Sequence, residues 1–205
     1  MGVIKKAFIS PHPPIVVHEV GKGEEKKAVA TIEALERLAR EVAKIKPSTI
    51  IVTTPHGPVF QDYIFINHND VLSGDFRRFG AAEVKLRYEN NLKLAGEITR
   101  LANSQGIPCG GLDGNLIKRF RISEELDHGA MVPLYFINKL YGGFRIVKIS
   151  IAAMPFKELY RFGRCIAKAV EQSDEEAVFL ASGDLSHRLA PDGPYGFNEC
   201  GPEFD

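Results

Sequence analysis

The chain has 205 residues, of which 44% are hydrophobic, so it is long enough for one sizeable core and requires no second domain. Lysine plus arginine and aspartate plus glutamate each number 26, which gives zero net charge and argues against nucleic acid or anionic membranes as partners. No apolar stretch approaches the roughly 20 residues of a membrane span. The first residues lead into a strand pattern rather than a signal peptide. We therefore expect a cytoplasmic protein that binds small neutral or weakly anionic molecules.

The first part of the chain reads as strand, helix and strand. Residues 4–10 form a short strand pattern, and residues 24–46 place apolar side chains on one helical stripe. A β-branched run follows at 48–55, and its continuous apolar character is typical of a strand buried on both faces. We expect this strand to pair in parallel with the first one.

The middle of the chain has weaker patterns. Strands are predicted at 62–70 and 81–89, and an amphipathic helix is predicted at 90–106, where Gly106 ends it. Residues 107–112 indicate another short strand.

The last third alternates clearly between helix and strand. Residues 128–143 predict a mostly buried helix, with Pro133 expected near its first turn. A strand at 144–152, a helix at 156–173 and a strand at 176–184 follow. The whole pattern predicts a single-domain α/β fold, with a mostly parallel central sheet flanked by helices.

Two histidines lie between or beside prolines directly after predicted strands. His12 occurs in SPHPP and His56 in TPHGP. Proline fixes φ near about −65°, so both imidazoles are displayed on stiff loops, and imidazole is a common metal ligand. Because the carboxyl ends of parallel strands meet at one edge, the two histidines are placed to share a metal. The alternative is that they are ordinary surface histidines, the role we expect for His18 and His68.

Two further histidines are placed to reach the same edge. His187 follows the last predicted strand in the polar run ASGDLSHRL, and His128 opens a predicted helix. Asp127 precedes His128, and capping this helix is its ordinary role. A Ser-His-Asp triad is available on paper, but we do not favour it because the chain has no G-x-S-x-G motif.

The segments SPHPP, TPHGPVFQDY, LDHGAMVPLYF and ASGDLSHRL, the last followed by GPYGFNECGPEFD, occur in an order that resembles the class III extradiol ring-cleavage dioxygenases. These form the protocatechuate 4,5-dioxygenase beta-subunit superfamily. The resemblance is closest to the dioxygenase-like domain of the AmmeMemoRadiSam system proteins, and it covers nearly the whole chain. It implies that residues 1–205 are one class III extradiol dioxygenase-like catalytic domain.

The resemblance implies a non-haem Fe(II) enzyme that opens a catecholic aromatic ring with O₂. His12 and His56 match the two iron-binding histidines of the family. His128 and His187 match the two histidines used for acid–base work and oxygen activation. Zinc is the alternative metal, as a native or an adventitious ion.

The carboxylate ligand of the family lies downstream of the GPEFD segment, so the resemblance implies that this chain is incomplete at its C-terminal end. Asp184, Glu199 and Glu203 do not match the family position and are not assigned. Two imidazoles without a carboxylate hold a metal less firmly, which leaves the activity of this chain open.

Two other functions stay open. The main alternative is a Memo-like, non-catalytic metal- or ligand-binding protein of the AmmeMemoRadiSam system, because this fold does not fix a function. A zinc hydrolase that uses His12 and His56 is less favoured. The expected partners are a small catecholic substrate and O₂, without nucleic acid or membrane. Association in a homo-oligomer or with an AmmeMemoRadiSam partner domain is left open.

Overall fold

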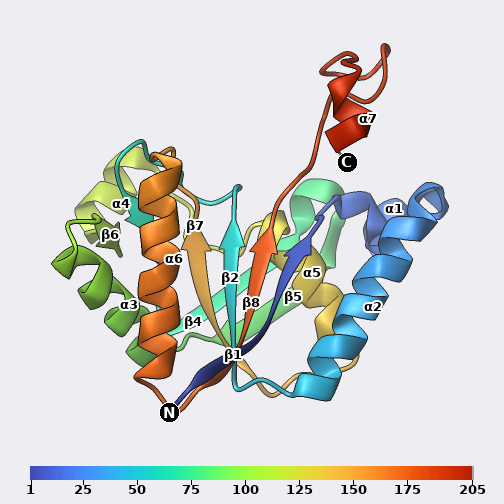
Figure 1. The fold of residues 1–205 in the computed structure, drawn as a ribbon. Helices are drawn as coiled ribbons and strands as arrows, with labels where there is room; N and C mark the ends of the chain where they lie inside the picture. Colours follow the sequence, from blue (N-terminus) through green and yellow to red (C-terminus); the bar gives the residue numbers. More distant parts are fainter. Residues whose placement is uncertain (205) are drawn as a thin grey trace.

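The computed structural model describes residues 1–204, and its centre is a four-stranded sheet in which all strands run parallel (Figure 1). The strands lie in the order β1 (Val3–Ser10), β8 (Glu176–Ser182), β2 (Thr49–Thr54) and β7 (Arg145–Ser150). The inner strands are largely buried because helices cover both faces of the sheet. The expected α/β fold with a mostly parallel central sheet flanked by helices is confirmed.

Strands β1 and β2 are not neighbours, so the prediction that they pair directly is wrong. Strand β8 lies between them and is parallel to both. The apolar run of β8 is mostly buried, and a buried strand needs a hydrogen-bonding partner along each edge. Chain order alone carries no signal for this insertion, since β8 comes from the far end of the chain.

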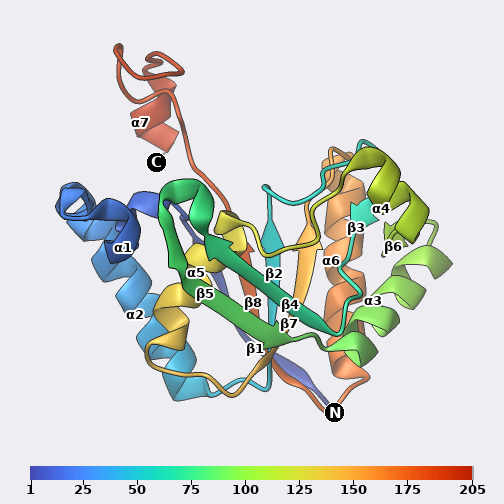
Figure 2. The same cartoon turned by 180° about the vertical axis from the view of Figure 1, so that it is seen from behind.

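Four long helices form the outer layers (Figures 1 and 2). Neighbouring residues of β2 identify the two faces, because Ile50 belongs to one apolar cluster and Ile51 to the other. The Ile50 face is covered by α2 (Val29–Ile45) and α5 (His128–Asn138), and the Ile51 face by α3 (Leu92–Ser104) and α6 (Phe156–Glu171).

A β-hairpin lies over the α5 side of the sheet (Figure 2). It pairs β4 (Val71–Phe76) with β5 (Ala81–Glu89), and β5 has the bounds that the sequence predicts. The strand predicted at 62–70 is wrong over most of its length, because only β3 (Ile64–Phe65) forms, paired with β6 (Cys109–Gly110). The Asn67 side chain accepts a hydrogen bond from the Asn69 amide at 2.9 Å, and this turn ends the extended run.

Two predicted helices have different bounds from those expected. The segment predicted from residue 24 starts as a 3₁₀ helix at Glu24–Ala28, and α5 ends at Asn138 rather than at residue 143. Pro133 lies inside α5, beyond the first turn in which we expected it. Six elements were not predicted: Pro14–Val16, α1 (His18–Gly21), β4, Arg77–Phe79, α4 (Gly114–Phe120) and α7 (Cys200–Phe204).

The segment after β8 extends away from the sheet and ends in α7 (Figure 1). It carries His187, and Leu189 and Phe197 form one isolated antiparallel bridge within it. Its exposed apolar side chains are Leu185, Leu189, Tyr195, Phe197 and Phe204. Across residues 1–204, no helix combines the length and the apolar character that crossing a membrane requires.

Candidate metal centre

The carboxyl ends of the four parallel strands are aligned in register. Ser10 of β1 lies opposite Ser182 of β8, and Thr54 of β2 lies opposite Ser150 of β7. The neighbouring pair Thr53 and Ala181 joins β2 to β8. A row of buried hydroxyl side chains therefore crosses the carboxyl end of the sheet. The loops that follow the four strands all begin at this edge.

Three histidines meet just above this row. His12 is the second residue after β1, His56 is the second residue after β2, and His128 is the first residue of α5. One ring nitrogen from each histidine lies within 4.8 Å of the other two. The His12 and His56 rings are nearly perpendicular, at 88°, with centroids 4.8 Å apart, whereas the His56 and His128 centroids are 3.9 Å apart.

His12 is 2% exposed, and its hydrogen bonds define its tautomer. Its Nδ1 lies 2.9 Å from the Ser182 hydroxyl, which also lies 2.5 Å from the Gly129 carbonyl oxygen. Serine has one hydroxyl hydrogen and a carbonyl can only accept, so Ser182 donates to Gly129 and accepts from the Nδ1–H of His12. In a neutral ring the Nε2 atom of His12 is therefore unprotonated, and its lone pair faces the Nε2 of His56, 2.8 Å away.

His56 is held by a tight loop. Its Nε2 lies 2.8 Å from the Nε2 of His12, and its backbone N–H donates to the Thr54 hydroxyl at 3.2 Å. The next residue must be glycine, since a Cβ on Gly57 would lie 2.0 Å from the Ser150 hydroxyl oxygen. This close approach fixes the height of the loop above the sheet.

Asp184, the second residue after β8, brings a carboxylate to the same place. Its Oδ2 lies 3.2 Å from the Nε2 of His12 and 3.8 Å from the Nε2 of His56. An unprotonated nitrogen and a carboxylate oxygen both carry lone pairs and repel each other at this distance. A cation between them would satisfy both. His187 does not join the three-histidine cluster. Its ring is half-exposed, and its Nε2 lies 3.6 Å from Oδ2 of Asp184, the residue that links it to the cluster.

The surroundings favour neutral imidazoles. Burial lowers the pKa of His12, with a further contribution from His56, although Asp184 opposes this shift. Burial, followed by the nearby His56 and His12, lowers the pKa of His128 to about 4. Both rings are therefore uncharged at neutral pH and can act as ligands or as proton acceptors.

A buried ion pair holds the start of α5. The Lys148 side chain is 1% exposed, and its Nζ lies 3.0 Å from Oδ2 of Asp127. Asp127 caps α5 by accepting from the Ala130 amide, as the sequence predicts, and it also accepts from the Thr54 hydroxyl. Burial alone would raise the pKa of Asp127, but Lys148 and these hydrogen bonds together hold it below its usual range. His128 is thereby fixed at the helix start.

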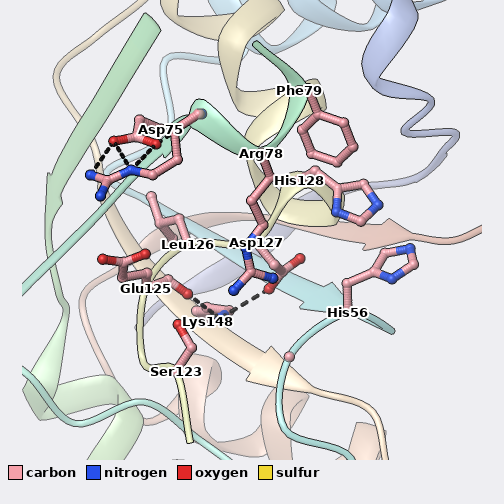
Figure 3. Close-up of a pocket in the computed structure, with 12 residues that line it drawn as sticks. His56, Asp75, Arg78, Phe79, Ser123, Glu125, Leu126, Asp127, His128 and Lys148 are labelled. Carbon is pink, nitrogen blue, oxygen red and sulfur yellow. Dashed lines mark hydrogen bonds and ion pairs between the residues drawn. The ribbon is translucent and has the colours of Figure 1, made fainter. Parts of the chain in front are cut away.

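A cavity of about 210 Å³ opens beside His56 and His128 (Figure 3). Phe79 forms part of its wall, and its ring centroid lies 5.2 Å from that of His128. Two side-chain nitrogen atoms of Arg77, Nε and Nη2, donate hydrogen bonds to the Asp75 carboxylate. Arg78 extends into the cavity in Figure 3, and it forms no hydrogen bond or ion pair with any other residue in 1–204.

The other two histidines lie outside the cluster. The Nδ1 atom of His18 lies 2.7 Å from Oε1 of Glu25, and the His68 ring lies 3.4 Å from the Thr99 hydroxyl. Their contacts fit the ordinary surface roles that the sequence suggests.

Sequence reasoning missed Lys148 and Arg78, and it left Asp184 unassigned. A signal for Lys148 exists, because a single lysine interrupts the otherwise apolar strand RIVKIS and a buried lysine needs a partner. Arg78 has no such signal, since the turn that displays it is not visible in the hydrophobic pattern.

The sequence matches a known family over residues 6–205, through a family model described as the catalytic LigB subunit of aromatic ring-opening dioxygenase. The chain belongs to the LigB family. This finding confirms the resemblance to the class III extradiol dioxygenases.

Three relatives illustrate the range of similar proteins. Protein CA_C1420 of Clostridium acetobutylicum is 50% identical over 198 residues, which are 97% of this chain and 42% of that protein. The 3,4-dihydroxyphenylacetate 2,3-dioxygenase of Escherichia coli is 29% identical over 183 residues, 85% of this chain and 63% of that enzyme. A MEMO1 family protein of Methanococcoides burtonii is 30% identical over 77 residues, 37% of this chain and 29% of that protein. The chain thus spans less than two thirds of the length of each.

Replacing Lys148 tests the buried ion pair. We expect Lys148→Met to lower the free energy of unfolding by about 3–5 kcal/mol, because Asp127 would remain buried without its counter-ion. Chemical denaturation measures the change. In the control Lys44→Met, the lost pair with Glu41 is at the surface, and the expected cost is below about 1 kcal/mol. Equal effects of the two substitutions would contradict a structural role for the buried pair.

Proposed function

We propose that the protein is a class III extradiol ring-cleavage dioxygenase that uses Fe(II) and O₂ to open a catecholic ring, with residues 1–205 as its catalytic domain. The observation that carries this proposal is the pair of Nε2 atoms of His12 and His56, 2.8 Å apart, at the carboxyl edge of a LigB-family sheet. In this proposal His12 and His56 are the histidine ligands of the metal.

The residues present fit such an ion. Two ligands in adjacent coordination positions, each about 2.1 Å from a metal, lie about 3 Å apart. The separation of the two histidine nitrogens is close to this value, and so is the 3.2 Å between His12 and the Asp184 carboxylate. Two histidines and one carboxylate with open positions are the ligand set typical of non-haem Fe(II) oxygenases. Asp184 is the carboxylate that we propose for this set within residues 1–204.

The chain's own groups would move the protons. Bound Fe(II) would lower the pKa of the catechol hydroxyls and bring the ring together with O₂. His128 is neutral near pH 7 and lines the cavity, so it can accept a hydroxyl proton from the substrate. His187, beside Asp184, is placed to return a proton as the ring opens. The Phe79 ring covers one side of His128.

Arg78 supports a substrate with an anionic side group. On the cavity wall Asp75 is paired with Arg77 and Asp127 with Lys148, whereas Glu125 forms no ion pair within residues 1–204. The Arg78 guanidinium, without such a partner, can bind a carboxylate through two parallel hydrogen bonds. The Escherichia coli relative is named for a dihydroxyphenyl ring that carries an acetate group, and this group is anionic like the side group proposed here.

The match to a MEMO1 family protein favours a second function, in which the same residues bind a metal without ring cleavage. The two functions differ in turnover and not in metal affinity. Both functions therefore predict that metal binding is lost when His12 or His56 is replaced. Only the dioxygenase also predicts that a ring-opened product forms.

Removing either proposed histidine ligand tests the metal site. We expect His12→Ala and His56→Ala to abolish tight Fe(II) binding, because each removes one of the two proposed histidine ligands. Anaerobic titration calorimetry measures the affinity. His18→Ala is the matched control and should leave it unchanged, since His18 is paired with Glu25 outside the cluster. Equal loss in all three variants would indicate non-specific binding and contradict the site.

Removing the other two histidines tests their role in proton transfer. In a preparation that cleaves a catechol, we expect His128→Ala and His187→Ala to retain iron but to lower kcat by about 10²- to 10⁴-fold. The protein is loaded with Fe(II) without air and mixed with a catechol and O₂, and the coloured ring-opened semialdehyde is followed. A variant that loses iron in proportion to activity has lost a ligand. Tight iron binding with no product from any catechol favours the second function.

Replacing Arg78 tests the choice of substrate. We expect Arg78→Gln to lower kcat/KM for 3,4-dihydroxyphenylacetate by roughly tenfold to a hundredfold, because a charge-assisted hydrogen bond is lost. The value for uncharged 4-methylcatechol should change little. Arg87→Gln is the control, as Arg87 is exposed on the same hairpin and does not line the cavity. An equal loss for both substrates would contradict recognition of the anionic group.

A further inference from the structure

Pro133 leaves one carbonyl of α5 without its helical donor. In an α-helix the carbonyl of residue 129 accepts from the N–H of residue 133, four positions later. Proline has no N–H, so the Gly129 carbonyl cannot make this bond. Both residues are buried, and bulk water does not reach them to substitute.

The Ser182 hydroxyl supplies the missing donor from a different element. It lies at the end of β8, is 5% exposed, and donates to the Gly129 carbonyl at 2.5 Å. The helix can approach this closely because residue 129 is glycine. A Cβ there would lie 2.5 Å from the Thr54 hydroxyl oxygen and 2.9 Å from Oδ1 of Asp127.

We propose that Pro133 is a positioning residue for the metal centre. By leaving the Gly129 carbonyl free, it engages the only hydroxyl proton of Ser182. Ser182 can then only accept from the Nδ1–H of His12, and this keeps the Nε2 of His12 unprotonated. For a neutral His12 ring the tautomer follows from the hydrogen bonds of Ser182, whereas its consequence for metal binding rests on the proposed function.

A donor at position 133 would remove this constraint. With an N–H there, the Gly129 carbonyl would be satisfied within the helix, and the Ser182 hydroxyl could donate to Nδ1 of His12 instead. The proton would then lie on Nε2, where the Asp184 carboxylate, 3.2 Å away, accepts it. Both tautomers of His12 would be satisfied, and only one of them presents a lone pair to the ion.

Nitrogen-15 NMR of histidine-labelled, metal-free protein measures the tautomer directly and requires neither iron nor a catechol. The wild-type His12 should be the Nδ1–H form. Pro133→Ala, which introduces a good helix former, should produce a measurable fraction of the Nε2–H form. Ser182→Ala should convert most of the population, because Nδ1–H would lose its acceptor, and Ser182→Thr should restore the wild-type form.

Ser150→Ala is the matched control. Ser150 is also buried at the end of a parallel strand, but its hydroxyl has no hydrogen-bond partner in the described chain. Its loss should leave the tautomer of His12 unchanged. An Nε2–H form in the wild type would overturn the proposal, and so would a wild-type tautomer in Pro133→Ala.

Fe(II) affinity is the second measurement. We expect it to fall by about 10- to 100-fold in Ser182→Ala and to recover in Ser182→Thr. In Pro133→Ala the affinity that remains should be proportional to the fraction of His12 that is still in the Nδ1–H form. If the tautomer changes in Pro133→Ala but the wild-type protein binds no iron, the proposed function is contradicted and the role of Pro133 stands. An unchanged tautomer contradicts the role of Pro133, whatever the iron affinity.

Discussion

The candidate centre depends on the parallel order of β1, β8 and β2, which brings three carboxyl ends side by side. His12, Asp184 and His56 each stand at the second position after their strand. Because the strands are in register, equal spacing along the chain becomes proximity in space. Distances of 2.8 to 3.8 Å between their polar atoms follow from this alignment, with no long loop needed to fold back over the sheet.

The start of α5 is the second organising feature, because it contacts three of the four strands. Asp127 binds Lys148 of β7 and Thr54 of β2, and the Gly129 carbonyl binds Ser182 of β8. These buried polar groups satisfy one another in surroundings of low dielectric, where each bond is strong and each unpaired group is costly. His128 lies within this network, so its ring is held beside the cavity by the same contacts that join the helix to the sheet.

Much of this could be predicted from sequence, for a definite reason. The strands and helices have strong hydrophobic periods, and prolines mark the loops of His12 and His56, so fold class and candidate residues follow from local patterns. The position of β8 could not be predicted, because strand order is a property of the whole sheet. The polar row at the strand ends, the partner of Lys148 and the projection of Arg78 depend on contacts between distant segments. Asp184 was visible in the sequence, but its closeness to His12 depends on the same strand order.

Strand β8 also determines when the centre can form. Of the four described strands of the sheet it is made last, yet it lies between two strands that are made much earlier. The contact between His12 and Ser182 spans 170 residues, so closing it carries an entropic cost that a local contact does not. Until then β1 and β2 lack their common neighbour, and a nascent chain cannot hold His12 and His56 together. A metal ion at the proposed site would therefore bind once β8 is in place, and it would stabilise the folded protein by mass action rather than by nucleating its folding.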